Sequence, residues 1–155
     1  MASAGIRYPF STPPVEGEAI TVADNVLWMR LPLPMALDHV NVYALDDGDS
    51  WTVIDTGFDT KKTREIWEKL LVGPLAGKPV GRIIGTHYHP DHIGLVGWFM
   101  QRGAAFSTTR TAWLMTRMLT LDPHAVPTPE TLAYYIRSGM DPEEYTARRT
   151  ERPFN

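Results

Sequence analysis

One heptapeptide decides how the rest of this chain is to be interpreted: Thr86-His87-Tyr88-His89-Pro90-Asp91-His92. It places three of the chain's five histidines and one carboxylate within six consecutive positions. Imidazoles and carboxylates at this density are typical of a metal site, and without a thiolate they suit Zn²⁺, with Fe or Mn as alternatives. The competing interpretation is an accidental group of surface histidines in a loop, which the alternation of the histidines disfavours.

The residues before the heptapeptide predict that it follows a strand. The run at 80–84 is apolar and β-branched, with glycine and proline around it, which predicts a buried strand ending near Thr86. If the chain stays extended through His89, as Pro90 favours, side chains two positions apart point the same way. His87 and His89 are therefore expected to converge on one ion.

The residues after the heptapeptide predict a helix. Pro90 suits the first helical turn, and residues 93–100 are apolar enough to be buried, so Asp91 and His92 belong to that first turn. Neighbouring helical side chains point about 100° apart. Asp91 and His92 are thus expected to hold a second ion beside the first, which makes two metals.

These motifs resemble a known family. The pattern His87-x-His89-x-Asp91-His92 between a strand and a helix resembles the signature of the metallo-β-lactamase superfamily. Two further segments resemble its strand-end aspartate motif and the strand before it, and the order agrees from about residue 22 to 108: Val53-Ile54-Asp55-Thr56-Gly57 and Val40-Asn41-Val42-Tyr43. The resemblance implies a four-layer α/β/β/α hydrolase with His87 and His89 on one metal and Asp91 and His92 on the other.

The resemblance also implies that the site needs more ligands than this sequence contains. The family adds two histidines and a bridging aspartate far downstream, whereas the one later histidine here, His124, lies in a proline-rich stretch too near the motif. We therefore expect the N-terminal half of the fold, one sheet with flanking helices. Residues 1–19 should form an extended arm, and residues 20–155 the half-domain, helical from about residue 109.

Asp55 is a candidate for orienting a metal ligand. It ends a predicted strand at 51–55, which should form a hairpin with 40–45 through an Asp-Gly turn. The preferred role is to accept a ring N–H from a ligand histidine. The alternative is that Asp55 caps the following helix or orders the turn.

The remaining pattern predicts regular elements separated by proline and glycine. The proline-broken apolar segment 31–37 is expected to be a loop, either tucked onto the core or contacting substrate. Gly94 and Gly97 in the helix expected at 92–101 suggest close packing on the sheet. The other predicted elements are a hairpin of 20–22 with 26–31, a helix to 72 capped by Asp59 or Thr60, a strand at 104–107, and helices at 109–120, 128–139 and from 141.

Composition limits the partners. The 155 residues carry a net charge of −3 and no long basic run, which argues against a nucleic-acid partner. No apolar run is long enough to cross a membrane. With no cysteine and no leader-like apolar core near the start, a cytoplasmic location is expected. A small-molecule substrate remains, together with a downstream half-domain or self-association as the protein partner.

The expected chemistry is hydrolysis by metal-activated water, with Asp91 holding or shuttling the proton. Ester, lactone, thioester, amide (including β-lactam) and phosphoester substrates stay open, as does persulfide oxidation at a mononuclear iron. The alternative, from a different class, is a non-catalytic remnant that binds metal weakly or serves as a partner subunit, because two histidines fall short of the three ligands of a catalytic zinc.

Overall fold

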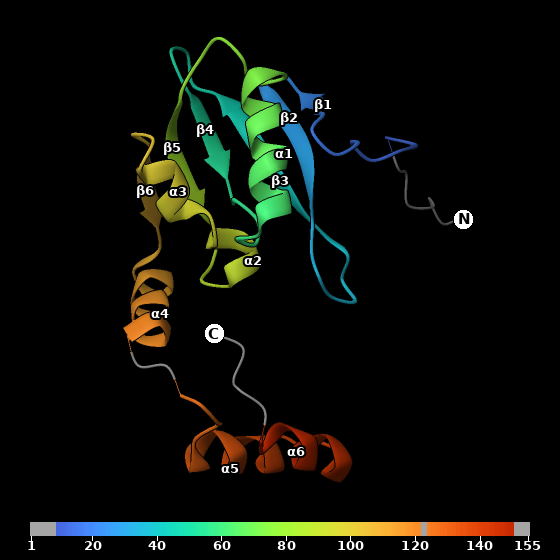
Figure 1. The fold of residues 1–155 in the computed structure, drawn as a ribbon, viewed down its shortest axis with the longest axis vertical. Coiled ribbons are helices and arrows are strands. Elements are labelled where there is room, and N and C mark those ends of the chain that lie inside the picture. The colour runs from blue at the N-terminus through green and yellow to red at the C-terminus, as the bar shows by residue number, and fades with distance from the viewer. Residues whose placement is uncertain (1–8, 122–123, 151–155) are drawn as a thin grey trace, which may run out of the picture. The chain divides into compact units, whose positions relative to one another are not determined.

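Two kinds of connection build the sheet. The computed structural model describes residues 9–121 and 124–150. Short turns at Asn25 and Gly48, both in the left-handed region that such turns require, join antiparallel strands, whereas longer helical crossovers join parallel ones. The six strands lie in chain order (Figure 1): β1 (Ile20–Ala23), β2 (Val26–Pro32), β3 (His39–Asp46), β4 (Trp51–Ile54), β5 (Val80–Gly85) and β6 (Ala105–Thr108). This confirms the predicted mixed α/β fold class.

The strands follow the prediction closely. Both predicted hairpins are present, β1 with β2 and β3 with β4. Pro32 extends β2 by one residue beyond the predicted end, which is tolerated because the strand stops there. Residues 9–19 contain no strand or helix, as expected for the arm, while residues 1–8 of the predicted arm lie outside the described part of the chain.

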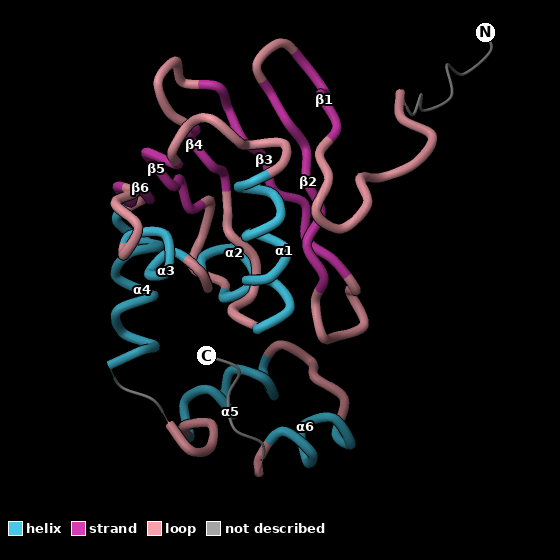
Figure 2. Tube along the Cα trace, turned by 45° about the horizontal axis from the view of Figure 1, so that its top comes forward, coloured by secondary structure: helices cyan, strands magenta, loops and turns pink. Residues whose placement is uncertain are grey.

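Helices cover one face of the sheet (Figures 1 and 2). They are α1 (Lys61–Val72) and α3 (Val96–Met100), while the short α2 (Pro90–Ile93) lies beyond the ends of the strands (Figure 1). Thr60 is the N-cap of α1, accepting from the Thr63 amide, which decides between the two predicted caps. Trp67 of α1 and Phe99 of α3 meet edge to face at 4.9 Å and are both buried, so the two helices share one core with the sheet.

The other face of the sheet carries a row of apolar residues that are only half buried. In each strand the residues that alternate with the core positions form this surface, which we call the open sheet face. Its central row runs straight across four strands, because Trp28 pairs with Tyr43, Tyr43 with Ile54, and Ile54 with Ile84. The apolar residues of the open sheet face are Ile20, Val22, Val26, Trp28, Tyr43, Leu45, Ile54 and Ile84, and the same face also carries Arg30, Asn41, Thr52 and Arg82.

The single helix predicted at 92–101 is wrong. The structure breaks it at Gly94 and Leu95, because Thr56 engages the His92 carbonyl and the Leu95 amide, groups that a continuous helix would use internally. Gly94 does pack closely, but on the loop after β4 instead of on the sheet, since a Cβ there would lie 2.8 Å from the Asp59 nitrogen and 2.9 Å from the Gly57 carbonyl oxygen. The same expectation for Gly97 is wrong, because a Cβ there would meet nothing within 4 Å.

The chain divides into two compact units, Met1–Ala112 and Trp113–Asn155. Helices occur where the sequence predicted them: α4 (Arg110–Leu121), α5 (Pro129–Arg137) and α6 (Pro142–Arg148). Thr128 and Asp141 cap α5 and α6 with side-chain oxygens, and proline follows each cap, which explains where both helices begin. No helix in the described part of the chain has the length and apolar character to cross a bilayer.

Candidate metal centre

The heptapeptide lies where two parallel strands end. β4 and β5 are parallel neighbours, so Asp55 after β4 and Thr86 after β5 reach the same edge of the sheet. The backbone of Asp55 turns sharply there, with a φ of 61°, while its N–H still donates to the Ile84 carbonyl at 3.0 Å. Aspartate is one of the few non-glycine residues that adopt this conformation readily. The turn carries the carboxylate toward the heptapeptide.

The Asp55 carboxylate joins three segments. It accepts hydrogen bonds from the Thr86 amide and hydroxyl, each at 2.8 Å, and lies 2.7 Å from Nδ1 of His92. Its side chain is only 6% exposed. Burial on its own raises the pKa of Asp55, but the hydrogen bonds from His92 and Thr86 outweigh it and hold that pKa below its ordinary value. Asp55 therefore stays ionised and fixes the His92 ring.

Four side chains of the heptapeptide present two pairs of donor atoms. His87 Nε2 lies 3.0 Å from His89 Nδ1, and His92 Nε2 lies 3.3 Å from Asp91 Oδ2. Two ligands of one tetrahedral zinc, each about 2.0–2.1 Å from the ion, are separated by about 3.3–3.4 Å. The rings of His87 and His92 are 4.0 Å apart at their centroids, so the two pairs adjoin. Both pairs suit a zinc ion in chemistry. The 3.3 Å between His92 and Asp91 matches the spacing of two zinc ligands, whereas the 3.0 Å between His87 and His89 is a hydrogen-bond distance and is shorter.

The local electrostatics separate the roles of two histidines. Burial lowers the pKa of His87, and the neighbouring His92 and His89 lower it further. His87 is thus kept neutral, the form that binds metal. The hydrogen bond to Asp55 raises the pKa of His92 against the effect of burial. Because Asp55 holds Nδ1, Nε2 of His92 is the nitrogen that faces Asp91.

The number of ligands is smaller than a catalytic zinc requires. Within residues 9–121 and 124–150, no group of three or more His, Asp or Glu side chains is placed to hold a metal ion. Each pair described above supplies two donors, whereas catalytic zinc sites use three protein ligands and a water. The donor set fits zinc in kind and falls one ligand short for each ion.

The proline-broken loop is tucked onto the core at its start, as one of the two predicted arrangements has it, and contact with substrate stays a prediction. Leu33 is buried against the core, whereas Met35 and Leu37 are 41% and 59% exposed. His39, after the loop, forms a close contact with the neighbouring Asp38. The loop therefore has an anchored beginning and an exposed apolar remainder.

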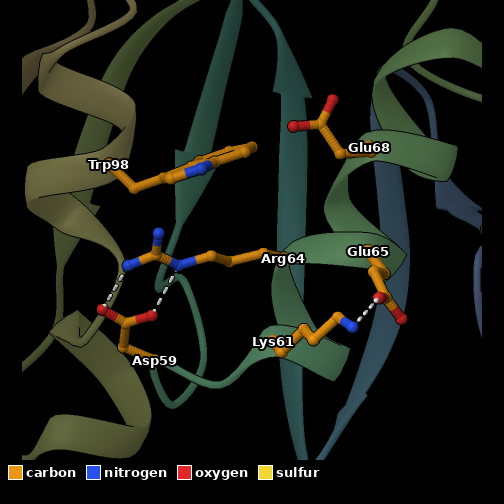
Figure 3. Close-up of a pocket in the computed structure, with 6 residues that line it drawn as sticks. All are labelled: Asp59, Lys61, Arg64, Glu65, Glu68 and Trp98. Carbon is orange, nitrogen blue, oxygen red and sulfur yellow. Dashed lines mark hydrogen bonds and ion pairs between the residues drawn. The ribbon is translucent and has the colours of Figure 1, made fainter.

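A hollow between α1 and α3 is lined mainly by charged side chains (Figure 3). Arg64 forms two hydrogen bonds to Asp59, at 2.7 and 2.8 Å. Lys61 pairs with Glu65, and Glu68 pairs with Arg102, whose guanidinium covers the Trp98 ring at 3.5 Å. Each charge that lines the hollow already has a partner of opposite sign. We assign these ion pairs a structural role, because two of them link α1 to the preceding loop and to Arg102.

Comparison with known proteins identifies the family. Residues 35–105 match the description of the metallo-beta-lactamase superfamily. A probable metallo-hydrolase of Bacillus subtilis (strain 168), YqjP, is 36% identical over 77 residues. A beta-lactamase domain protein from Burkholderia ambifaria superposes on 96% of this chain, with a TM-score of 0.72 and 30% identity. Together these matches indicate the metallo-β-lactamase superfamily.

The matched relatives are longer than this chain. The chain spans 44% of the Burkholderia ambifaria structure, and the match to YqjP covers 49% of this chain and 24% of that protein. FIM-1 from Pseudomonas aeruginosa, solved in a mono-zinc form, has the same fold at 24% identity, with a TM-score of 0.56 over 69% of this chain and 48% of its own. The chain thus corresponds to about half of a superfamily structure.

Proposed function

We propose that the complete protein is a metal-dependent hydrolase whose first ligands are His87 and His89 for one ion and Asp91 and His92 for a second. Superfamily membership supports hydrolase chemistry in general terms. One observation supports the specific proposal: two pairs of donor atoms lie where β4 and β5 end. His87 Nε2 and His89 Nδ1 are 3.0 Å apart, and His92 Nε2 and Asp91 Oδ2 are 3.3 Å apart. Zn²⁺ is the preferred ion, and Fe or Mn remain alternatives.

The chain's own residues divide the work. Asp55 orients His92 by accepting from Nδ1, the usual role of a carboxylate behind a metal-bound histidine. Asp91 is proposed to hold or transfer a proton as well as to bind metal. A bound zinc would supply an activated water at neutral pH and polarise the substrate. The bond that is cleaved, whether ester, lactone, thioester, amide or phosphoester, is left open, and the substrate is proposed to be a small molecule.

The open sheet face supports the proposed protein partner. On the described chain this face has a row of apolar residues that are only partly buried: Trp28, Tyr43, Ile54 and Ile84. A downstream half-domain with a second sheet, or a second copy of this chain, would bury that row and could bring the missing ligands. Nucleic acid and membrane are not proposed as partners, and a cytoplasmic location stays a prediction.

The second candidate is a non-catalytic chain that binds metal weakly or serves as a partner subunit. One observation favours it: the described residues offer each ion two donors instead of three. A version of the protein extended downstream discriminates between the two, since only the hydrolase proposal expects such a version to gain tight metal binding and turnover.

Elemental analysis with zinc titration tests the metal centre. We expect the chain to bind Zn²⁺ weakly and substoichiometrically, and to lose that binding when His87 and His89 are both changed to Ala. His39→Ala is the matched control, because His39 pairs with Asp38 outside the heptapeptide. Equal binding by the double variant and the wild type would contradict the assignment of the ligands, and two tightly held ions per chain would contradict the incomplete site.

A further inference from the structure

Thr56 is a fully buried threonine beside Asp55, and all of its polar atoms form hydrogen bonds. Its amide donates to the His92 carbonyl at 2.6 Å, and its hydroxyl donates to the same carbonyl at 3.0 Å. The hydroxyl oxygen also accepts from the Leu95 amide at 3.1 Å, and the Thr56 carbonyl accepts from Trp67 Nε1 at 2.8 Å. Thr56 thus connects α1 to the segment that carries His92.

These bonds explain the break between α2 and α3. In a continuous helix the Leu95 amide would donate to the carbonyl four residues earlier, and the His92 carbonyl would accept from the amide four residues later. Thr56 engages both groups instead. The chain can therefore leave the helix after Ile93 without orphaning either buried group.

The geometry points to a positioning role: we propose that Thr56 fixes the backbone of His92 so that the imidazole, held by Asp55, presents Nε2 to the metal. This inference rests on the proposed function. Two consecutive residues divide the task, since Asp55 holds the side chain of His92 and Thr56 holds its backbone. Loss of the Thr56 hydroxyl removes one bond to the His92 carbonyl and leaves the Leu95 amide without its acceptor.

The experiment compares three substitutions in the same chain. Thr56→Val keeps the size of the side chain and removes the hydroxyl, whereas Thr56→Ser keeps the hydroxyl. Thr63→Val is the matched control, because Thr63 is equally buried and its hydroxyl bonds to Thr60, the N-cap of α1, and not to His92. Thr56→Ala serves as a second test if Thr56→Val does not fold, because it removes the hydroxyl and adds no bulk.

Two readouts separate this inference from the proposed function. In metal-free protein, the ring NMR signals of His92 and hydrogen exchange at the Leu95 amide should change in Thr56→Val and stay as in wild type in Thr56→Ser and Thr63→Val. In a chelator-competition titration with Zn²⁺, Thr56→Val should bind about ten- to a hundredfold more weakly, the usual effect of losing support behind a metal ligand. Thr56→Ser and Thr63→Val should stay within about threefold of wild type.

The outcomes are distinct. A wild-type chain that binds no zinc, combined with altered His92 signals in Thr56→Val alone, contradicts the proposed function and supports the positioning of His92 by Thr56. Folded Thr56→Val with wild-type His92 signals overturns the positioning role, whatever the zinc result. Equal changes in Thr63→Val also overturn it, because they would mean that any lost buried hydroxyl has the same effect.

Discussion

The closest backbone approach behind the metal centre occurs at Gly94, and Gly94→Ala tests it. An added Cβ would lie 2.5 Å from the Pro90 carbonyl oxygen, 2.8 Å from the Asp59 nitrogen and 2.9 Å from the Gly57 carbonyl oxygen. All three are backbone atoms, so no flexible side chain can move aside. Overpacking of this kind costs about 1–3 kcal/mol and sometimes more. We expect a loss of about 3 kcal/mol, a large part of a total stability of about 5–15 kcal/mol.

Gly97→Ala is the matched control. Gly97 lies in α3, three residues from Gly94, and a Cβ there would meet nothing within 4 Å. Alanine is favoured over glycine inside a helix by about 0.5–1 kcal/mol, so this change should be neutral or stabilising. The two Gly→Ala changes should therefore differ by about 4 kcal/mol, the sum of the expected loss and gain.

Urea unfolding followed by tryptophan fluorescence and circular dichroism measures both variants. A shift in the midpoint at constant m-value reports stability alone. The reasoning is refuted if Gly94→Ala unfolds within about 0.5 kcal/mol of the wild type, or if Gly94→Ala and Gly97→Ala shift the midpoint equally. Either result would mean that the backbone at residues 57–59 can shift to make room for the added Cβ, so that this turn does not hold the heptapeptide rigidly.

Three further predictions concern the centre and the open sheet face. The ionised Asp55 should stabilise metal-free protein above about pH 4, the unfolded pKa, and lose that contribution as pH falls through its lowered folded pKa. Urea unfolding from pH 3 to 7 should therefore give a flatter acid limb for Asp55→Asn, and parallel curves would contradict this. In a complete enzyme, Asp91→Asn should reduce turnover about a hundredfold or more with little effect on folding, and unchanged turnover would remove Asp91 from the chemistry. The chain alone should self-associate or bind hydrophobic dye through the open sheet face, and Ile54→Thr with Ile84→Thr should weaken both effects; a monodisperse wild type without dye binding in light scattering would mean that these residues close their own core.

The heptapeptide carried most of what could be predicted about the site. Alternation of His87 and His89 after an apolar run, with Pro90 next, predicted an extended segment followed by a first helical turn. The helical turn is present. The extended segment is wrong for most of its length, because β5 ends at Gly85, residues 86–88 bend, and only His89 is extended. Asp55 was predicted from its place at a strand end, and its carboxylate does bond to a histidine ring of the heptapeptide. Its role behind a metal ligand stays a prediction.

Contacts between distant segments escaped prediction. Thr56 was read only as part of a strand-end motif, although its hydroxyl determines where α2 ends. The helix predicted across 92–101 was wrong for that reason: local periodicity was correct on both sides of Gly94, but a residue 36 positions earlier takes the backbone groups that would continue the helix.

The sequence by itself determined the order of strands and helices, the turns at Asn25 and Gly48, and the four candidate ligands, because each depends on residues within a few positions of one another. Only the tertiary structure decided which ring nitrogen of His92 faces Asp91, which residues bond to His92, and which of the two glycines leaves no room for a Cβ. These properties arise because the ends of the parallel strands β4 and β5 lie side by side, which places groups more than thirty residues apart in the sequence within hydrogen-bond distance. No local sequence pattern predicts hydrogen bonds between segments so far apart in the chain.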